Sequence, residues 1–351
     1  MMMKEKIDSI LRASVEVKAS DIHLTVGVPP VMRINGELKR YGQEVLKPAD
    51  TEEMAKAIIP ENMWDIFLEK GELDFSYGVA GSSRFRVNTY HQRRSVAMAL
   101  RVISSKIPSI EELDLPAIIP ELVHKPQGLI LVTGPTGSGK STTLASMIDY
   151  MNRRMRKHVI TLEDPIEYLH RHGNCIIDQR EVGFDTLNYA NGLRAALRQD
   201  PDVILVGEMR DLETISTAIT AAETGHLVLG TLHTSSAPTT INRIIDVFPS
   251  AQQAQIRIQL ASVLVGIISQ RLFPTPDKQG RKAATEILVN NPAIANLIRN
   301  EKIHQIQSSM QTSRSQGMQT LEMNIKELLD RGLIQRDSAT KYLQEKMMNN
   351  G

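Results

Sequence analysis

Apolar and polar positions follow different patterns before and after residue 105, which indicates two regions of different architecture. In the first region, Ile7, Ile10, Leu11 and Val15 recur at helical spacing and predict an amphipathic helix over residues 4–17. Shorter strand-like and helical segments follow it. Strands are expected at 20–24, at 31–34, directly after Asn35-Gly36, and at 73–79, 84–91 and 95–103, and helices at 51–59 and 61–70. Because Asn-Gly suits a tight hairpin turn, the strands on either side of it should pair.

These elements predict a small α+β domain over residues 1–105. The segment 106–117 contains Pro108 and Pro116 and has few helical periods, so an extended linker is expected there.

The second region, from residue 118 to 351, alternates apolar strands with amphipathic helices. The strands are expected at 128–133, 158–163, 203–207 and 227–232. This alternation predicts an α/β fold with a parallel sheet and helices on its faces. After Ser250 the pattern predicts mainly helices, at about 250–270, 292–300, 319–331 and 337–348, with Gly332 as a helix stop. The part of the domain from about residue 290 to 351 is therefore expected to be helical.

Size and composition restrict the kind of protein. A chain of 351 residues is long for one core at about 150 residues per domain, so two domains are expected. The net charge of +1 gives no electrostatic reason to expect nucleic acid or anionic lipid as a partner. The single cysteine, Cys175, excludes an intrachain disulfide and a zinc site built from several cysteines. No apolar run approaches the ~20 residues of a membrane span, and a cytoplasmic protein without a transmembrane segment is expected.

The segment Gly134–Ser141, GPTGSGKS, has the form of a phosphate-binding loop, G-x-x-x-x-G-K-[ST]. An apolar strand precedes it and a helical pattern over 141–155 follows it, which argues against a glycine-rich turn that matches by chance. Backbone amides at such a helix start hold phosphate, Lys140 supplies a cation, and Ser141 offers a hydroxyl to Mg²⁺. The loop predicts ATP and Mg²⁺ as ligands. The nucleotide-binding residues are expected to be Gly134, Pro135, Thr136, Gly137, Ser138, Gly139, Lys140, Ser141 and Thr142.

Two acidic segments follow other predicted strands. After the strand at 203–207, Gly207 stands where the Walker B pattern usually has aspartate, and Glu208 comes next. Glu208 is a candidate for orienting metal or water, with an exposed strand-end acid as the alternative. Glu163, in TLEDPIEY at 161–168, ends the strand at 158–163 and could activate water; a solvated Asp-Pro turn is the alternative. Ser141 and Glu208 are the expected metal ligands.

Two histidines flank the strand at 227–232. His226 and His233 stand at its two ends and share no helical face, so they are not expected to form a metal pair. Each could sense the γ-phosphate or contact an interface, because an imidazole can donate a hydrogen bond to phosphate.

Arginines form two further groups. Arg194 and Arg198 are four residues apart in a predicted helix and should share one face. Five arginines lie on or beside strands of the first domain: Arg84, Arg86, Arg93, Arg94 and Arg101. Either group could be a solvated basic face, or could stabilise charge on the transferring phosphoryl group as arginine fingers do.

Four segments together resemble those of the type II/type IV secretion ATPase superfamily. They are GPTGSGKST at 134–142, TLEDPIEY at 161–168, VILVGEMRD at 203–211 and TAAETGHLVLGTLHT at 220–234. KASDIHL at 18–24 also matches, so the resemblance covers nearly the whole chain. It implies a PAS-like N-terminal domain, a RecA-like ATPase domain, a homohexameric ring and ATP between the two domains.

Within this superfamily the chain is similar to the ATPases that retract type IV pili. Assembly and secretion members usually carry an extra N-terminal domain and a four-cysteine zinc loop, whereas this chain starts with the PAS-like domain and has only Cys175. Residues 293–299, AIANLIR, resemble the A-I-R-N-L-I-R signature of retraction ATPases but have Ala295 in place of arginine.

The resemblance also implies roles for individual residues. Arg86 and Arg101, fifteen positions apart, match two arginines that reach the phosphates. Arg194 and Arg198 match a pair in the segment LRxxLRQDPD, Glu163 matches the acid that acts as general base, and Glu208 matches the Walker B acid.

The expected function is that of a hexameric motor in which ATP hydrolysis powers pilus retraction and twitching motility. It would act at the cytoplasmic face of the inner membrane through a pilus platform protein. Alternatives are an accessory retraction paralogue, an ATPase of pilus assembly, DNA uptake or secretion, and a nucleotide-gated scaffold with little turnover. A helicase is disfavoured by the net charge of +1 and by the absence of an aromatic–basic stripe.

Overall fold

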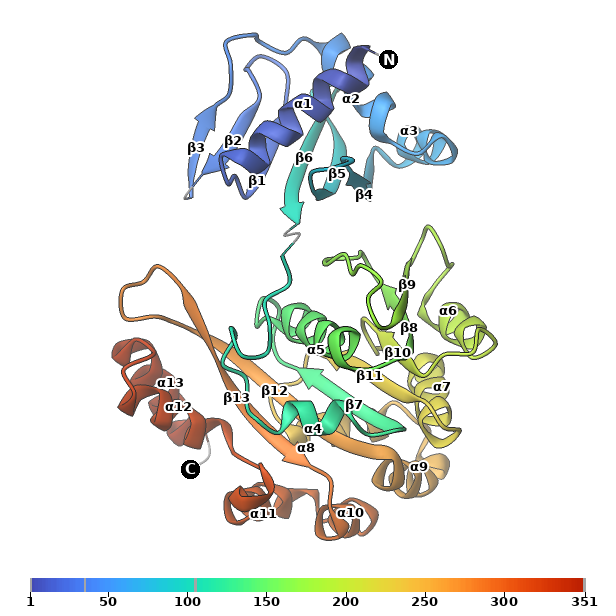
Figure 1. Cartoon of the computed structure of the whole chain (residues 1–351), viewed down its shortest axis with the longest axis vertical. Coiled ribbons are helices and arrows are strands. Elements are labelled where there is room, and N and C mark those ends of the chain that lie inside the picture. Colours follow the sequence, from blue (N-terminus) through green and yellow to red (C-terminus); the bar gives the residue numbers. More distant parts are fainter. Residues whose placement is uncertain (1, 35, 104–105, 350–351) are drawn as a thin grey trace. The chain divides into compact units, whose positions relative to one another are not determined.

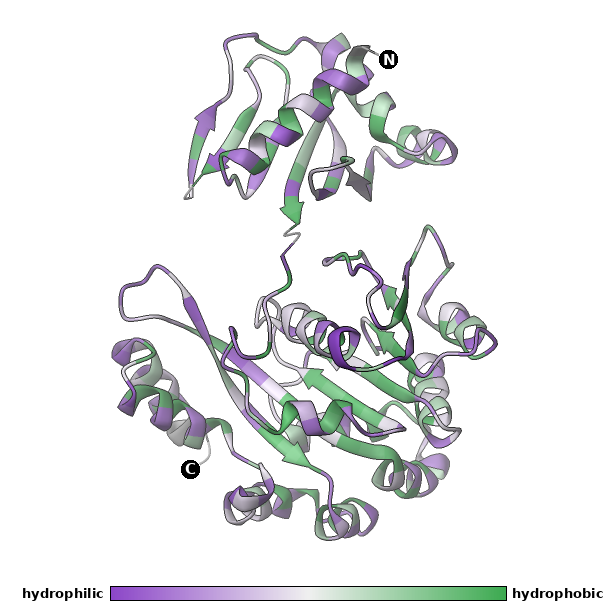
Figure 2. Cartoon of the chain, in the orientation of Figure 1, coloured by the Kyte–Doolittle hydropathy of each residue, from purple (hydrophilic) through white to green (hydrophobic). Residues whose placement is uncertain are grey.

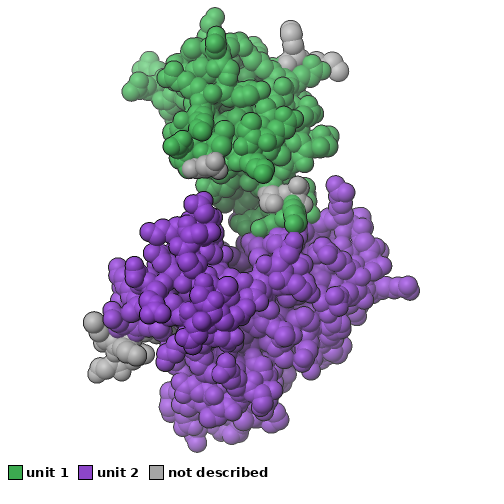
Figure 3. Space-filling view, turned by 60° about the vertical axis from the view of Figure 1, so that its left-hand side comes forward, with its two compact units in different colours: residues 1–106, 165–169 green, residues 107–164, 170–351 purple. Residues whose placement is uncertain are grey.

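The computed structural model describes residues 2–34, 36–103 and 106–349 of the chain (Figure 1). They fall into two compact units, which Figure 3 colours separately. Unit 1 comprises residues 1–106 with 165–169, and unit 2 comprises residues 107–164 with 170–351. Across the described ranges, no helix has the length and apolar character needed to cross a membrane.

The described part of unit 1 contains a six-stranded antiparallel sheet in the order β3-β2-β1-β6-β5-β4. Its strands are β1 (Asp21–Leu24), β2 (Val31–Ile34), β3 (Glu37–Arg40), β4 (Glu72–Gly78), β5 (Arg84–Gln92) and β6 (Ser95–Ile103). Its helices are α1 (Met2–Glu16), α2 (Pro48–Ile58) and α3 (Trp64–Lys70), with a 3₁₀ turn at Glu61–Met63. The predicted elements and the β2–β3 hairpin are confirmed, although Asn35 itself lies outside the described residues.

The core of unit 1 lies on one face of this sheet. Phe75, Phe85 and Val87 are buried there with apolar side chains of α1 and α2. Along β5, buried Phe85 and Val87 alternate with exposed or half-buried residues, among them Arg86. Because successive side chains of a strand point to opposite faces, Arg86 lies on the face away from this core.

The described part of unit 2 is built on a seven-stranded sheet in the order β13-β12-β7-β11-β10-β8-β9. Its strands are β7 (Gly128–Thr133), β8 (His158–Glu163), β9 (Ile176–Glu181), β10 (Val203–Val206), β11 (Leu227–Leu232), β12 (Leu264–Pro274) and β13 (Arg281–Val289). All neighbours pair in parallel except β12 and β13. The four predicted strands and the α/β class are confirmed, with an antiparallel strand added at one edge.

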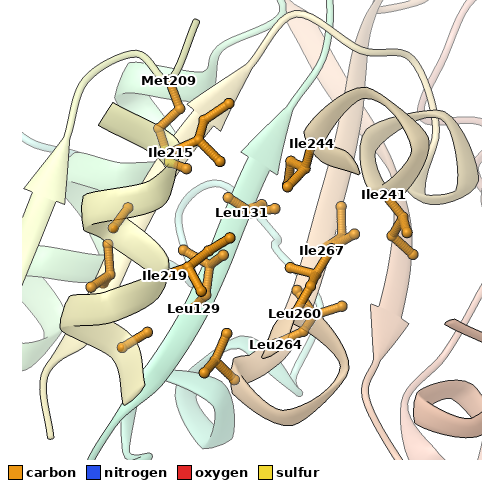
Figure 4. Close-up of a cluster of buried hydrophobic side chains, with 14 of the residues drawn as sticks. Leu129, Leu131, Met209, Ile215, Ile219, Ile241, Ile244, Leu260, Leu264 and Ile267 are labelled. Carbon is orange, nitrogen blue, oxygen red and sulfur yellow. The ribbon is translucent and has the colours of Figure 1, made fainter. Parts of the chain in front are cut away.

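Helices cover both faces of this sheet. They are α4 (Ile119–Val123), α5 (Lys140–Arg154), α6 (Tyr189–Ala196), α7 (Leu212–Glu223), α8 (Ala237–Asp246) and α9 (Ser250–Val263). Figure 4 shows Leu129 and Leu131 of β7 packed with Ile215 and Ile219 of α7 and with side chains of α8, α9 and β12. The intervening Ile130 and Val132 belong to the cluster that contains Leu144, Met147 and Ile148 of α5.

Every residue of β7, β10 and β11 is buried, and these strands are strongly hydrophobic in Figure 2. A strand that is covered on both faces reads as a continuous apolar run, which is why the sequence revealed these strands. Because they run parallel, their carboxyl ends lie at one edge of the sheet. The candidate site residues that follow β7, β8, β10 and β11 are therefore expected at this edge.

The predicted helix over 250–270 is wrong in its last third, residues 264–270. The helix α9 ends at Val263, and β12 begins at Leu264 and pairs in parallel with β7. The strands β9 and β13 were also not predicted. A short apolar run such as 263–268 has no period that separates a buried strand from a buried helix. Pairing with β7 on one side and β13 on the other decides that this segment is a strand.

The described C-terminal part contains four α-helices; the first, third and fourth agree with the predicted ranges, and the second was not predicted. They are α10 (Pro292–Arg299), α11 (Ile306–Thr312), α12 (Leu321–Asp330) and α13 (Arg336–Asn349). Gly332 has a φ of +65°, the left-handed conformation that ends many helices. Ala295, in α10, is only 7% exposed and packs in the main core. An arginine at this position would bury a charge, so alanine suits the packing found here.

Candidate active site

The loop between β7 and α5 has the conformation that its glycines predict. Gly134, Gly137 and Gly139 have φ values of +144°, +75° and +89°. A Cβ atom on Gly134 would lie 2.4 Å from the carbonyl oxygen of Gln270 and 2.6 Å from Ser138 Oγ. Glycine is therefore required at position 134 both by backbone conformation and by the close approach of β12.

The loop ends in the first turn of α5, where an anion is favoured. The first helical hydrogen bond runs from Thr143 N to Gly139 O at 3.0 Å, so the amides of 140–142 lie at the open end of the helix. Within the described residues, the buried Ser138 Oγ has no hydrogen-bond partner. Backbone amides, a helix start and a buried hydroxyl fit the oxygen atoms of a phosphate.

Lys140 links this loop to two other strands. Its Nζ donates to Gly134 O at 2.9 Å and to Pro135 O at 3.2 Å, and it lies 3.5 Å from His233 Nδ1. On its other side, His233 Nε2 lies 2.8 Å from Glu208 Oε1. One imidazole thus connects the lysine of the phosphate-binding loop with the acid that follows β10.

Parallel register explains why these groups meet. Leu232, the last residue of β11, pairs with Thr133 of β7, and Val206 of β10 pairs with Gly230 of β11. His233 and Glu208 therefore leave the sheet beside the phosphate-binding loop. The structure brings Lys140, Glu208 and His233 together as the sequence predicted, while their catalytic roles remain predictions.

Glu163 ends β8 in a network that orients its carboxylate. Its Oε1 accepts hydrogen bonds from Thr161 Oγ1 at 2.6 Å and from Gln179 Nε2 of β9 at 3.0 Å. Two donors on one oxygen hold the carboxylate in a defined direction, as a general base requires. Gln179 was missed from the sequence because β9 was not predicted.

Tyr189, at the start of α6, also belongs to this acidic region and was also missed. Burial raises the pKa of its phenol, and the charges of Asp164, Glu208 and Glu163 raise it further. The phenol is therefore neutral and keeps its proton beside three carboxylates.

Packing explains why glycine replaces the usual Walker B aspartate. A Cβ atom on Gly207 would lie 2.9 Å from the carbonyl oxygen of Leu162 and 3.0 Å from Tyr189 Oη. The first contact is with the backbone of β8, which cannot move aside as a flexible side chain can. This site consequently has no room for an aspartate, and Glu208 is the carboxylate that β10 presents.

We predict that Gly207→Ala will lower the free energy of unfolding by about 1–3 kcal/mol, the usual cost of overpacking. Urea denaturation measures the change. Gly78→Ala is the matched control, because no atom lies within 4 Å of its added Cβ, and it should be neutral or slightly stabilising. Equal effects of the two substitutions would contradict the packing explanation.

His226 does not lie with the other site residues. It precedes β11, and its carbonyl accepts from Gly128 N at the beginning of β7, 3.0 Å away. Six strand residues at about 3.3 Å each separate this end from the phosphate-binding loop. The prediction that His226 senses phosphate is wrong for the loop of its own chain, and a role at an interface remains a prediction.

Arg194 and Arg198 do not share a helix face, because α6 ends at Ala196. Arg198 lies in the turn that follows and donates to the carbonyl of Arg194 at 3.1 Å. The Arg194 guanidinium pairs with Glu213 of α7 and donates to Asn191 Oδ1 at 2.6 Å. The two arginines are therefore linked by a hydrogen bond from the Arg198 side chain to the Arg194 backbone at the end of the helix.

Arg86 and Arg101 of unit 1 are direct cross-strand partners in β5 and β6. The spacing of fifteen residues therefore reflects hairpin register. Both line a cavity together with Asp21, Asp74 and Asn88. Arg101 Nε donates to Asp21 Oδ1 at 2.9 Å. Although burial opposes ionisation of Asp21, hydrogen bonds from Ser20 and Arg101 outweigh it and lower its pKa.

A parallel sheet, a phosphate-binding loop between β7 and α5, and a lysine–histidine–glutamate contact at the strand ends define a P-loop ATPase. The family model described as type II/IV secretion system protein matches residues 1–347. The chain belongs to this family, and the family predicted from the sequence is confirmed.

Several relatives are similar over nearly their whole length. The chain is 48% identical to the type IV pilus retraction ATPase PilT of Pseudomonas aeruginosa over 333 residues, covering 95% of this chain and 96% of that protein. It is 44% identical to a twitching motility protein of Neisseria gonorrhoeae, covering 96% and 90%. These relatives confirm the predicted similarity to the retraction ATPases.

Solved structures agree with this fold. A crystal structure of the pilus retraction motor PilT with bound ADP superposes with a TM-score of 0.89 at 51% identity, covering 95% of this chain and 96% of that one. The ATPase DotB of Legionella pneumophila has a TM-score of 0.86 at 29% identity, covering 97% and 96%.

Proposed function

We propose that this protein hydrolyses ATP to power the retraction of type IV pili. The contact of Lys140 with His233, and of His233 with Glu208, carries the enzymatic part of the proposal. The cation that we propose for the phosphates and the acid that we propose for water lie at the same sheet edge. The relatives that retract pili support the physiological part.

ATP is the proposed substrate, with its phosphates on the loop 134–142. A bound Mg²⁺ would neutralise phosphate charge, and Ser141 and Glu208 are the proposed ligands. Among the described residues, no group of three or more histidine, cysteine or acidic side chains could hold a metal ion. Proteins commonly hold Mg²⁺ through one or two side chains, substrate phosphates and water, which is the kind of site proposed here.

We assign Glu163 the role of general base. Its carboxylate, held by Thr161 and Gln179, would accept a proton from the attacking water. Glu208 would orient water or metal, and His233 would respond to phosphate next to Lys140. Arg194 and Arg198 would support the acidic region from the end of α6.

We further propose that Arg86 and Arg101 act on the phosphates, and that 106–117 is the linker between a PAS-like domain (1–105) and the ATPase domain (118–351). The chain would work as a homohexamer on an inner-membrane pilus platform protein, at the cytoplasmic face and without nucleic acid. In such a ring, we propose that His226 contacts the neighbouring subunit.

We predict that Arg86→Ala will lower kcat by about 10-fold or more while changing the Kd for nucleotide much less. A guanidinium that stabilises developing charge contributes mainly in the transition state. Steady-state phosphate release and equilibrium nucleotide titration measure the two quantities. The control is Arg40→Ala, an exposed arginine of β3. An unchanged kcat for Arg86→Ala would assign Arg86 to a solvated basic face.

The physiological test is a strain that lacks this protein. We expect excess surface pili and loss of twitching if the protein powers retraction. The wild-type gene should restore normal piliation and twitching, and a Lys140→Ala gene should not. Absent pili would support an assembly ATPase instead. If the purified protein released no phosphate from ATP even with the pilus platform protein present, a nucleotide-gated scaffold would be supported instead.

A further inference from the structure

We propose that Gln270 of β12 is a positioning residue for the phosphate-binding loop, which it holds in its nucleotide-binding conformation. The inference rests on the proposed ATPase function, because it gives that loop a support from a neighbouring strand. Gln270 lies outside the sequence motifs, in a segment that the hydrophobic pattern predicts to be helical.

The side-chain amide of Gln270 is hydrogen-bonded at both of its ends. Its Nε2 donates to the carbonyl oxygen of Ser138 at 2.6 Å, and its Oε1 accepts from Thr143 Oγ1 at 2.9 Å. Ser138 belongs to the loop, and Thr143 belongs to the first turn of α5. One amide thus spans the loop-to-helix junction, and with only 3% of Gln270 exposed, water does not compete for these bonds.

The strand approaches the loop so closely that the glycines are required. The backbone oxygen of Gln270 would be 2.4 Å from a Cβ on Gly134, and its Nε2 would be 3.1 Å from a Cβ on Gly139. Ser269 pairs with Thr133 in the sheet, and their hydroxyls are 2.7 Å apart. Gln270 therefore stands beside the loop at the point where the β7–β12 pairing stops.

Peptide geometry connects this contact to phosphate binding. The carbonyl of Ser138 and the N–H of Gly139 belong to one planar trans peptide and point in opposite directions. When Gln270 holds the carbonyl toward β12, the N–H of Gly139 points away from β12, and we infer that it faces the concave side of the loop. Such inward amides form the anion-binding concavity of a phosphate-binding loop. Gln270 would act through this amide and would not touch the nucleotide.

Four substitutions separate the contributions of the two hydrogen bonds. Gln270→Met keeps a similar length without hydrogen bonds. Gln270→Glu keeps an acceptor for Thr143 but, when ionised, has no donor for the Ser138 carbonyl. Thr143→Val removes only the bond to Oε1, and Thr143→Ser restores it. The control is Asn290→Leu, because Asn290 Nδ2 donates to the carbonyls of Ala261 and Leu264 at the opposite end of the sheet.

We expect Gln270→Met and Gln270→Glu to raise the Kd for Mg-ATP by about 10-fold, with folding checked by circular dichroism. Thr143→Val should raise it less, Thr143→Ser should recover most of the wild-type affinity, and Asn290→Leu should leave it unchanged. Thr143→Val should add little in the Gln270→Met background, because both substitutions break one network. As pH falls, Gln270→Glu should approach wild type, because a protonated carboxyl can donate to the Ser138 carbonyl.

The inference would be overturned if folded Gln270→Met and Thr143→Val proteins bound Mg-ATP with the wild-type Kd. It would also be overturned if the Kd of Gln270→Glu, divided by the Kd of wild type, did not change with pH. The proposed function fails separately. Wild-type protein that binds Mg-ATP but releases no phosphate would refute the ATPase, while the comparison of Kd values would still test the role of Gln270.

Discussion

Lys140→Ala is expected to lower kcat for ATP hydrolysis by at least about 100-fold, the usual loss when one group that stabilises transferring charge is removed. Lys140 Nζ is the cation of the loop, held by the carbonyls of Gly134 and Pro135 next to His233. Negative charge accumulates on the phosphate oxygens during phosphoryl transfer, so the ammonium contributes most where it is needed for rate. Steady-state phosphate release measures the effect.

The folded state should survive this substitution. The ammonium of Lys140 bonds carbonyls of a partly exposed loop, and losing such bonds costs about 1 kcal/mol each. Lys326→Ala, an exposed lysine of α12, controls for the loss of a positive charge and should keep wild-type turnover. A folded Lys140→Ala protein with wild-type kcat would remove the loop from the catalytic site.

Glu208→Gln is expected to lower kcat by about 100-fold or more while the Kd for nucleotide changes by less than about threefold. The Glu208 carboxylate faces His233 Nε2 at 2.8 Å and accepts from Arg210, and its side chain is only 19% exposed. Glutamine has nearly the same volume as glutamate but no charge. Packing is therefore preserved, while the carboxylate proposed to orient water or metal is removed. Single-turnover phosphate release and nucleotide titration separate the two quantities.

Three further variants test whether the effect is specific to Glu208. Glu121→Gln, at an exposed acid of α4, controls for the loss of one negative charge. Glu163→Gln should also lower kcat, and the double variant with Glu208→Gln should be no worse than the slower single variant if both acids serve one water. Wild-type turnover in folded Glu208→Gln would leave Glu208 as a strand-end acid without a role in hydrolysis.

The parts of the fold that local chemistry controls were predictable from the sequence. The phosphate-binding loop depends on glycines at 134, 137 and 139, whose positive φ values other residues rarely adopt. The central strands are apolar throughout because helices cover both faces of the sheet, and that pattern is visible without coordinates. Parallel order then places the residues after each strand at one edge, so Glu208 and His233 were found beside the loop.

The same rule contained a signal that was not used. His226 precedes its strand, and the starts of parallel strands lie at the edge opposite the phosphate-binding loop. Strand direction alone was enough to separate His226 from His233. The spacing of Arg194 and Arg198 was a different matter, because a gap of four residues indicates a shared face only while the helix continues, and α6 ends at Ala196.

By itself, the sequence determined where the glycine-rich loop between β7 and α5 lies, which strands form the centre of the sheet, and which family the chain belongs to. Each of these depends on contiguous residues, whose conformation and period are local properties. Only the tertiary structure decided that 264–274 is a strand, that Gly207 is packed against the backbone of β8, and that Gln270 supports the loop. These outcomes depend on pairing and close approach between distant segments, for which one strand's own sequence carries no signal.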